Sequence, residues 1–225
     1  MNWTDKITVT NEDNMELMAR YPDKYFDLAI VDPPYGINVS KTIHHQPNTI
    51  NKITNYTQKK WDNTIPNKIY WDELFRVSKN QFVWGGNYFT EYLQPTKDWI
   101  IWDKEQPADM HFSQAELCWC SFGRGLRIFK RSIAKDQNRV SNNKIKALEY
   151  CRIHPTQKPI ALYKWILDKY AKQGDKILDT HLGSGSSRIA AYDLGFDFTG
   201  FELDSEYIEK STIRFNNHIN QLTLF

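Results

Sequence analysis

The spacing of hydrophobic residues changes along the chain and predicts strands that alternate with helices. Ile7 and Val9 alternate with threonines, as in a half-buried strand, whereas Met15 and Met18 are spaced as on one face of a helix. Residues 28–31 are apolar without alternation, which is typical of a strand covered on both faces. The same criteria predict a helix at 67–78 and strands at 82–84, 99–102 and 117–120.

The C-terminal third of the chain shows this alternation most regularly. Pro159 can occupy the first turn of a helix, Gly174 ends that helix, and Asp204 is the expected N-cap of the last helix. Strands are predicted at 176–179 and 198–202, with a helix between them. Strands separated by helices imply a parallel sheet with helices on both faces, so we expect an α/β fold with a mostly parallel, twisted sheet.

Length and composition indicate a globular protein of one domain. The chain has 225 residues, 40% hydrophobic and 25% charged, and we expect residues 1–225 to form a single domain. Neither a bilayer-spanning run nor an apolar signal core is present, so we expect a cytoplasmic protein that does not contact membranes. The three scattered cysteines suit neither a disulfide framework nor a zinc site, and no metal is expected.

The net charge of +2 conceals two basic segments. Ten basic and two acidic residues lie between Arg124 and Lys158, so this window carries +8 and the rest of the chain −6. Residues 38–60 contain four lysines and no acidic residue. A local excess of this size favours contact with a polyanion over the alternative of a solvated loop. We expect a basic insert at 123–153 and a flexible loop at 38–65 to face that partner.

A glycine turn between two predicted strands indicates half of a nucleotide-binding unit. The strand that ends at Asp179 is followed by Gly183 and Gly185, a helix, and Glu202 at the end of the next strand. The glycines let the backbone approach a ligand, and the glutamate can accept hydrogen bonds from ribose hydroxyls. Arg188 stands where the dinucleotide fingerprint has its third glycine, so the pattern favours an adenosine-containing ligand without a pyrophosphate. The alternative is an ordinary tight turn.

A second motif, Asp32-Pro33-Pro34-Tyr35, follows the predicted buried strand at 28–31. Ligand sites of open α/β sheets lie at the carboxyl ends of strands. The Asp32 carboxylate and the Pro33 carbonyl can each accept a hydrogen of an exocyclic amine, and Tyr35 can stack on a planar base. The alternative is a rigid turn, because each proline restricts the backbone.

Together, the two motifs resemble those of the amino-methyltransferases of DNA, which transfer a methyl group from S-adenosylmethionine to an exocyclic nitrogen. The catalytic motif precedes the cofactor motif, with a basic insert between them, which is the permuted order of the β-group. The resemblance covers nearly the whole chain and implies a Rossmann-like methyltransferase domain. Thr180-His181 departs from the Pro-Phe common in this family. The matching segments are 12–14, 27–36, 84–87, 154–159, 179–185 and 201–204.

The resemblance also implies roles for individual residues. Those expected to bind S-adenosylmethionine are Asp13, Thr156, Lys158, Asp179, Gly183, Gly185 and Glu202. Asp32, Pro33 and Tyr35 are expected to hold a base rotated out of double-stranded DNA. Aspartate at position 32 favours the N6 of adenine, with the N4 of cytosine as the close alternative. An RNA methyltransferase and a non-catalytic DNA-binding protein of the same fold remain open.

The basic insert and the last residues suggest macromolecular partners. We expect phosphate contacts from Arg124, Arg127, Lys130 and Arg131. Residues 221–225, Gln-Leu-Thr-Leu-Phe, resemble the pentapeptide by which bacterial proteins bind the replication sliding clamp. The alternative for this tail is packing against the protein's own fold. The resemblance is also compatible with a homodimer.

Overall fold

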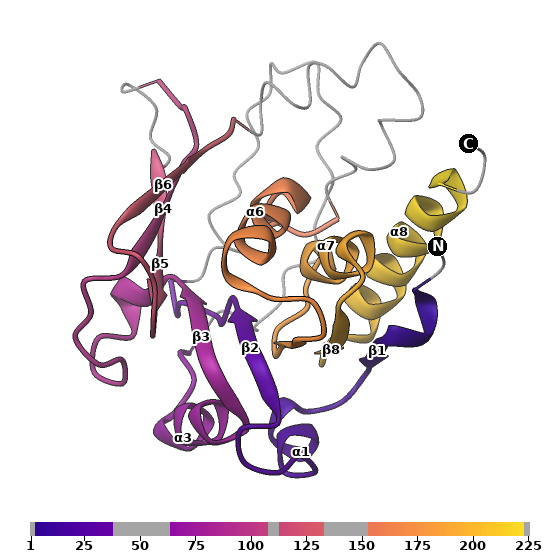
Figure 1. Ribbon diagram of the computed structural model, residues 1–225, viewed down its shortest axis with the longest axis horizontal. Helices are drawn as coiled ribbons and strands as arrows, with labels where there is room; N and C mark the ends of the chain where they lie inside the picture. The colour runs from indigo at the N-terminus through magenta and orange to yellow at the C-terminus, as the bar shows by residue number, and fades with distance from the viewer. Residues whose placement is uncertain (1–2, 38–63, 108–112, 133–152, 223–225) are drawn as a thin grey trace.

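The computed structural model describes residues 3–37, 64–107, 113–132 and 153–222, which contain one eight-stranded sheet (Figure 1). The strand order is β1-β8-β7-β2-β3-β5-β4-β6. Strand β5 runs antiparallel to both neighbours, β3 and β4, and the other neighbouring strands in this order are parallel. The predicted α/β fold with a mostly parallel sheet is confirmed.

The elements follow the chain in the predicted alternation. The strands are β1 (Ile7–Thr10), β2 (Phe26–Val31), β3 (Ser78–Trp84), β4 (Trp99–Asp103), β5 (Ala115–Cys120), β6 (Arg127–Lys130), β7 (Lys176–Asp179) and β8 (Asp197–Phe201). The α-helices are α1 (Asn14–Met18), α3 (Lys68–Val77), α6 (Ile160–Tyr170), α7 (Ser186–Leu194) and α8 (Ser205–Leu222). Two 3₁₀ turns, η1 (Thr4–Lys6) and η2 (Gly86–Tyr88), complete the described elements.

Helices cover both faces of the sheet. Figure 1 shows α6, α7 and α8 on one face and α1 and α3 on the other. The side chains of β2 alternate between the two layers: Leu28 and Ile30 pack in the cluster that includes α6 and α7, whereas Ala29 and Val31 pack in the cluster that includes α1 and α3. This double burial explains why the sequence of β2 is apolar without alternation.

Strand β3 begins earlier than its sequence indicates. Hydrophobic residues predict a strand from Phe82, but β3 starts at Ser78, directly after α3. The polar residues at its start are satisfied by β2, since Lys79 Nζ lies 2.6 Å from Asp27 Oδ1 and Asn80 Nδ2 donates to the Asp27 carbonyl at 3.2 Å. Polar side chains therefore do not exclude pairing at this end of the sheet.

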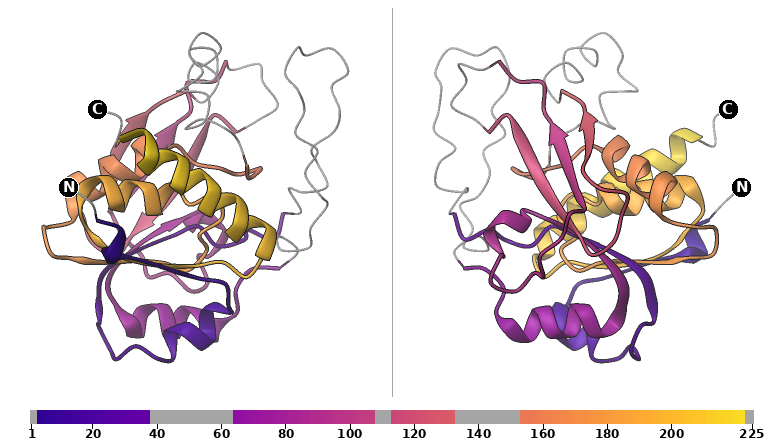
Figure 2. Two further views of the ribbon diagram at one scale, coloured as in Figure 1. Left: turned by 90° about the vertical axis from the view of Figure 1, so that its right-hand side faces the viewer. Right: turned by 60° about the vertical axis from the view of Figure 1, so that its left-hand side comes forward.

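The basic insert, for which the sequence indicates a loop or a hairpin without a defined strand, contains one strand. Residues 127–130 form β6, which pairs in parallel with β4 rather than forming a hairpin with β5. Phe129 packs partly on the core, and Trp102 Nε1 donates to the Arg131 carbonyl at 3.0 Å. In the right-hand view of Figure 2, β4, β5 and β6 stand beside the C-terminal helices, and Phe129 on β6 contacts Trp165 on α6 with 5.6 Å between ring centroids.

Parts of three predicted segments lie outside the described residues. These parts are 38–63 of the predicted loop, 133–152 of the basic insert and the end of the tail at 223–225. Within the described ranges, no helix is both long and apolar enough to cross a membrane.

Substitutions in α3 test the packing of the sheet against this helix. Leu74 is fully buried, whereas Ile69 on the same helix is 63% exposed. We expect Leu74→Ala to lower the free energy of unfolding by about 2–5 kcal/mol, because it removes buried methyl groups and leaves a cavity. The matched control Ile69→Ala should change it by less than about 0.5 kcal/mol. Denaturant unfolding measures both, and equal effects would contradict the packing described here.

Candidate active site

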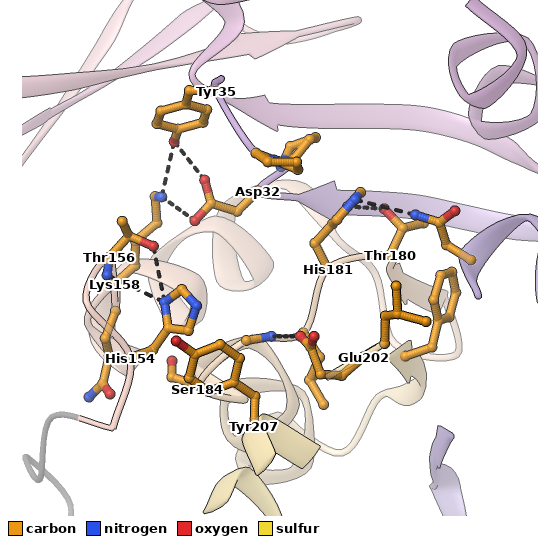
Figure 3. Close-up of a pocket in the computed structure, with 18 of the residues that line it drawn as sticks. Asp32, Tyr35, His154, Thr156, Lys158, Thr180, His181, Ser184, Glu202 and Tyr207 are labelled. Carbon is orange, nitrogen blue, oxygen red and sulfur yellow. Dashed lines mark hydrogen bonds and ion pairs between the residues drawn. The ribbon is translucent and has the colours of Figure 1, made fainter. Parts of the chain in front are cut away.

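A cavity lies at the point in the sheet where the strand order reverses, between β7 and β2. Strands β2 and β7 are parallel neighbours, but the chain continues from β7 to β8 on one side and from β2 to β3 on the other. Such a switch point leaves a crevice at the carboxyl ends of the strands. The cavity here encloses about 1100 Å³, including the open space at its mouth. Its walls include Asp13, Asp32, Pro33, Tyr35, Thr156, Lys158, Gly183 and Glu202, and Figure 3 shows it with 18 lining residues.

At one end of the cavity, Asp32 follows directly from β2 and is held by two donors. Tyr35 Oη donates to Asp32 Oδ1 at 2.6 Å, and the Lys158 ammonium donates to Asp32 Oδ2 (Figure 3). Lys158 Nζ also lies 3.3 Å from Tyr35 Oη. The sequence placed Lys158 among the cofactor residues, but the structure places its ammonium on the carboxylate of the catalytic motif.

The ring of Tyr35 is fixed by its neighbours. It stacks on Tyr88, with 4.9 Å between ring centroids and 14° between planes. Gly85 lies directly against it, since a Cβ atom at this position would approach Tyr35 Cε1 to 2.2 Å. Glycine is therefore needed at position 85, because any side chain there would collide with the aromatic ring of the Asp-Pro-Pro-Tyr motif.

Lys158 also reaches a carboxylate that the sequence analysis did not single out. Glu116 on β5 lies with Oε2 3.2 Å from Lys158 Nζ and with Oε1 2.7 Å from Lys104 Nζ. Burial lowers the pKa of Lys158, but Asp32 and Glu116 outweigh it and hold the pKa above its usual value. Burial raises the pKa of Glu116, but the two ammonium groups bring it below its usual value. Both residues are therefore charged at neutral pH.

At the other end, Glu202 is oriented by backbone amides. Its Oε2 accepts from Gly183 N at 2.8 Å, and its Oε1 accepts from Asp204 N at 3.0 Å. Burial raises the pKa of Glu202, although these amides oppose the shift. A carboxylate oxygen can accept more than one hydrogen bond, so both oxygens retain capacity for a ligand.

Two of the predicted cofactor residues do not line the cavity. Asp179 lies beneath the glycine turn, where its carboxylate accepts from Ser187 Oγ at 2.5 Å and from His181 N at 3.0 Å. Burial raises its pKa to about 7. Gly185 adopts φ +71° and is the N-cap of α7. Both residues shape the turn from behind instead of facing the cavity.

The other predicted residues are divided between the cavity and the edge of the sheet. Asp13 lines the cavity and caps α1, with Oδ1 accepting from Met15 N at 2.7 Å. Thr156 also lines it, and its Oγ1 lies 3.1 Å from His154 Nδ1. The four basic residues do not line it: Arg124, Arg127 and Lys130 are exposed and Arg131 is partly buried, on and around β6.

His181, which departs from the family pattern, belongs to a buried hydrogen-bond network. Its Nδ1 lies 2.9 Å from Thr180 Oγ1, its Nε2 lies 3.3 Å from Asn14 Nδ2, and Tyr70 Oη lies 2.7 Å from Thr180 Oγ1. Burial lowers the pKa of His181 to about 3, so the ring is neutral at physiological pH. Because Asn14 can only donate through Nδ2, Nε2 is the acceptor and Nδ1 carries the hydrogen. The polar pair Thr180-His181 therefore finds its hydrogen-bond partners within the protein.

Two bacterial relatives resemble the chain over most of its length. The Type II methyltransferase M2.DpnII of Streptococcus pneumoniae is 22% identical over an alignment of 246 positions, gaps included. The alignment covers 91% of this chain and 88% of the relative. The Type II methyltransferase M.HinfI of Haemophilus influenzae is 25% identical over an alignment of 241 positions. This alignment covers 90% of this chain and 66% of the relative.

Solved structures share the fold. The crystal structure of the M1.HpyAVI–SAM complex has a TM-score of 0.57 and 19% identity, covering 93% of this chain and 99% of the other. The PvuII DNA methyltransferase, described as cytosine-N4-specific, has a TM-score of 0.57 and 14% identity, covering 93% and 88%.

The decisive match is to a protein family. The family model described as DNA methylase matches residues 26–213, which run from the first residue of β2 into α8. The matched range includes Asp32, Lys158 and Glu202 and spans well over half of the chain. The resemblance inferred from the sequence is thereby confirmed, and the protein belongs to the N6/N4 DNA methylase family.

Proposed function

We propose that this DNA methylase transfers a methyl group from S-adenosylmethionine to the exocyclic N6 of an adenine rotated out of double-stranded DNA. The observation that carries the proposal is the shared cavity, which has the Asp32 carboxylate and Tyr35 at one end and the anchored Glu202 carboxylate at the other. A nucleoside cofactor and a planar base can therefore meet within one enclosure.

The Glu202 end of the cavity has the groups that S-adenosylmethionine requires. Glu202 offers charged acceptors for ribose hydroxyls, and the Gly183 backbone leaves room for close approach. Apolar side chains for an adenine ring are supplied by Leu182, Phe201 and Leu203. When bound, the cofactor supplies an electrophilic methyl group on a positively charged sulfur.

The Asp32 end fits the exocyclic amine of a base. The Asp32 carboxylate and the Pro33 carbonyl are acceptors for its two hydrogens, and the Tyr35 ring supplies a face for stacking. Hydrogen bonding draws the amine nitrogen toward tetrahedral geometry and frees its lone pair for attack. During transfer of that methyl group, the Asp32 carboxylate would stabilise the positive charge that develops on the amine nitrogen, and it would accept the proton that the methylated amine releases.

Adenine is proposed over cytosine because the motif begins with aspartate. The alternative keeps the same mechanism at the N4 of cytosine, and a structural neighbour at a TM-score of 0.57 is described as cytosine-N4-specific. Methylation of RNA and DNA binding without catalysis are weaker alternatives. The groups that bring an amine and a cofactor together are present, which argues for catalysis.

DNA would approach the edge of the sheet that carries β6. Arg124, Arg127 and Lys130 are exposed there, next to the half-buried Arg131. Lys130 Nζ lies 3.8 Å from Asp103 Oδ2, a distance at which solvent-exposed charges interact weakly, so the ammonium is available to a phosphate. Sliding-clamp binding through 221–225, a homodimer and a cytoplasmic location remain predictions from the sequence.

The reaction is tested by nucleoside mass spectrometry of unmethylated DNA incubated with the protein and S-adenosylmethionine. We expect N6-methyladenine, and Asp32→Ala should lower its formation by roughly 1000-fold, because the amine loses a charged acceptor. Cofactor affinity, measured by calorimetry, should be nearly unchanged. N4-methylcytosine would overturn the choice of base, and turnover retained by Asp32→Ala would overturn the mechanism.

Cofactor binding is tested at Glu202. We expect Glu202→Gln to weaken S-adenosylmethionine binding by roughly 10- to 100-fold in calorimetry, because it removes charge-assisted hydrogen bonds to the ribose. The control is Glu206→Gln on α8, where the carboxylate pairs with Lys210 and is 39% exposed. Equal affinity of the Glu202 variant and the unsubstituted protein would exclude this residue from the cofactor site.

The DNA interface is tested by salt dependence. The logarithm of the binding constant should fall steeply with the logarithm of salt concentration, and Arg127→Gln should reduce the slope by about 0.9, the value expected for one phosphate contact. Lys68→Gln is a control on α3, where the side chain is 74% exposed. A flat salt response, or equal effects of the two variants, would contradict the proposed interface.

A further inference from the structure

The ammonium of Lys158 is shared between two carboxylates on different strands. The Lys158 side chain is only 1% exposed, and its Nζ contacts Asp32 Oδ2 and lies 3.2 Å from Glu116 Oε2. Lys104 Nζ lies 2.7 Å from the other oxygen of Glu116. Positive and negative groups thus alternate from Asp32 at the cavity to Lys104 beside β5.

This arrangement places a cation on the acceptor that the reaction needs. Tyr35 Oη donates to Asp32 Oδ1 and the Lys158 ammonium donates to Asp32 Oδ2, so an incoming amine has to share this carboxylate with a positive charge. An ammonium on Asp32 also opposes the positive charge that develops on the amine nitrogen. Methyl transfer is therefore favoured when the Lys158 ammonium moves away from Asp32 and the amine of the base binds this carboxylate instead.

Glu116 offers the ammonium a second position. Its Oε2 is buried and, among the described residues, accepts no hydrogen bond of regular distance and angle, although the Lys158 ammonium lies 3.2 Å away. Its Oε1 is held by Lys104. A small displacement of Nζ toward Glu116 would turn the existing ion pair into a hydrogen bond, and it would satisfy a buried acceptor that is costly to leave unpaired.

We propose that Glu116 is a positioning residue that takes over the Lys158 ammonium when the target amine binds Asp32. The inference rests on the proposed function, since it assumes that Asp32 receives the amine. With Lys158 neutralised by Glu116, the full charge of Asp32 faces the amine. Without Glu116, Lys158 would remain on Asp32 and compete with the base.

The test compares steady-state kinetics of the full-length protein and Glu116→Gln on DNA that contains methylation sites found by sequencing. We expect kcat to fall roughly tenfold to hundredfold, which is less than the loss for a group that contacts the substrate directly. The dissociation constant for S-adenosylmethionine and the melting temperature should stay close to those of the unsubstituted protein. Glu116→Asp keeps the charge and should recover part of the lost kcat.

Asp27→Asn provides a matched control. Asp27 forms the same kind of ion pair between neighbouring strands, with Lys79 at 2.6 Å, and its side chain is 25% exposed against 22% for Glu116. It lies near the amino end of β2, away from the cavity. We expect this variant to keep its kcat, whereas equal losses in Asp27→Asn and Glu116→Gln would show a general effect of losing an ion pair and overturn the inference.

A double variant covers the case in which Glu116→Gln does not fold. Lys158→Met with Glu116→Gln removes two opposite charges together, and its single-turnover rate is compared with that of Lys158→Met. Equal rates would support the inference, because Glu116 would have no effect once Lys158 is absent. A further tenfold loss in the double variant would overturn it.

The kinetic outcomes separate the inference from the proposed function. If the unsubstituted protein methylates neither adenine nor cytosine in DNA, both fail. If it methylates adenine and Glu116→Gln keeps the full kcat, only the role of Glu116 fails.

Discussion

Strands β2 and β7 pair directly, Leu28 with Ile177 and Ala29 with Leu178, although they come from opposite ends of the chain. The proposed active site depends on this pairing. It brings the Asp-Pro-Pro-Tyr segment after β2 beside the glycine turn after β7, and the chain then diverges to either side and leaves the crevice open. The permuted order of the two motifs does not matter to the chemistry, because the sheet restores their adjacency.

The groups in this crevice are buried, so each charge must be matched. Lys158 is nearly inaccessible to solvent and lies between Asp32 and Glu116, while Glu202 is held by two backbone amides. An isolated buried charge would be too costly to maintain. The charge balance at the Asp32 end of the cavity therefore depends on Glu116, which does not line the cavity, and β5 becomes part of the proposed active site.

Sequence patterns predicted the core better than the edges. The run at 28–31 predicted a strand buried on both faces, because two helical layers require that composition. Strand β6 was missed because an exposed edge strand has no alternating apolar face: Arg127, Ile128 and Lys130 are all exposed. Glu116 was missed because its partner Lys158 is distant in sequence, although a glutamate inside the otherwise apolar β5 was a usable signal. Asp179 and Gly185 lie within the predicted motif, but spacing alone could not tell the cavity wall from its support.

The main chain at Lys158 is anchored, since its carbonyl accepts a hydrogen bond from Ser186 Oγ at 2.8 Å at the start of α7. The Lys158 side chain thus reaches the two carboxylates and the phenol around Nζ from a main chain that is held in place. A tetrahedral ammonium can redirect its three hydrogens among such acceptors by rotation about a single bond. A guanidinium cannot, because its donors lie in one plane and must turn as a unit. Residue 158 is therefore a site where arginine, with equal charge, would not replace lysine.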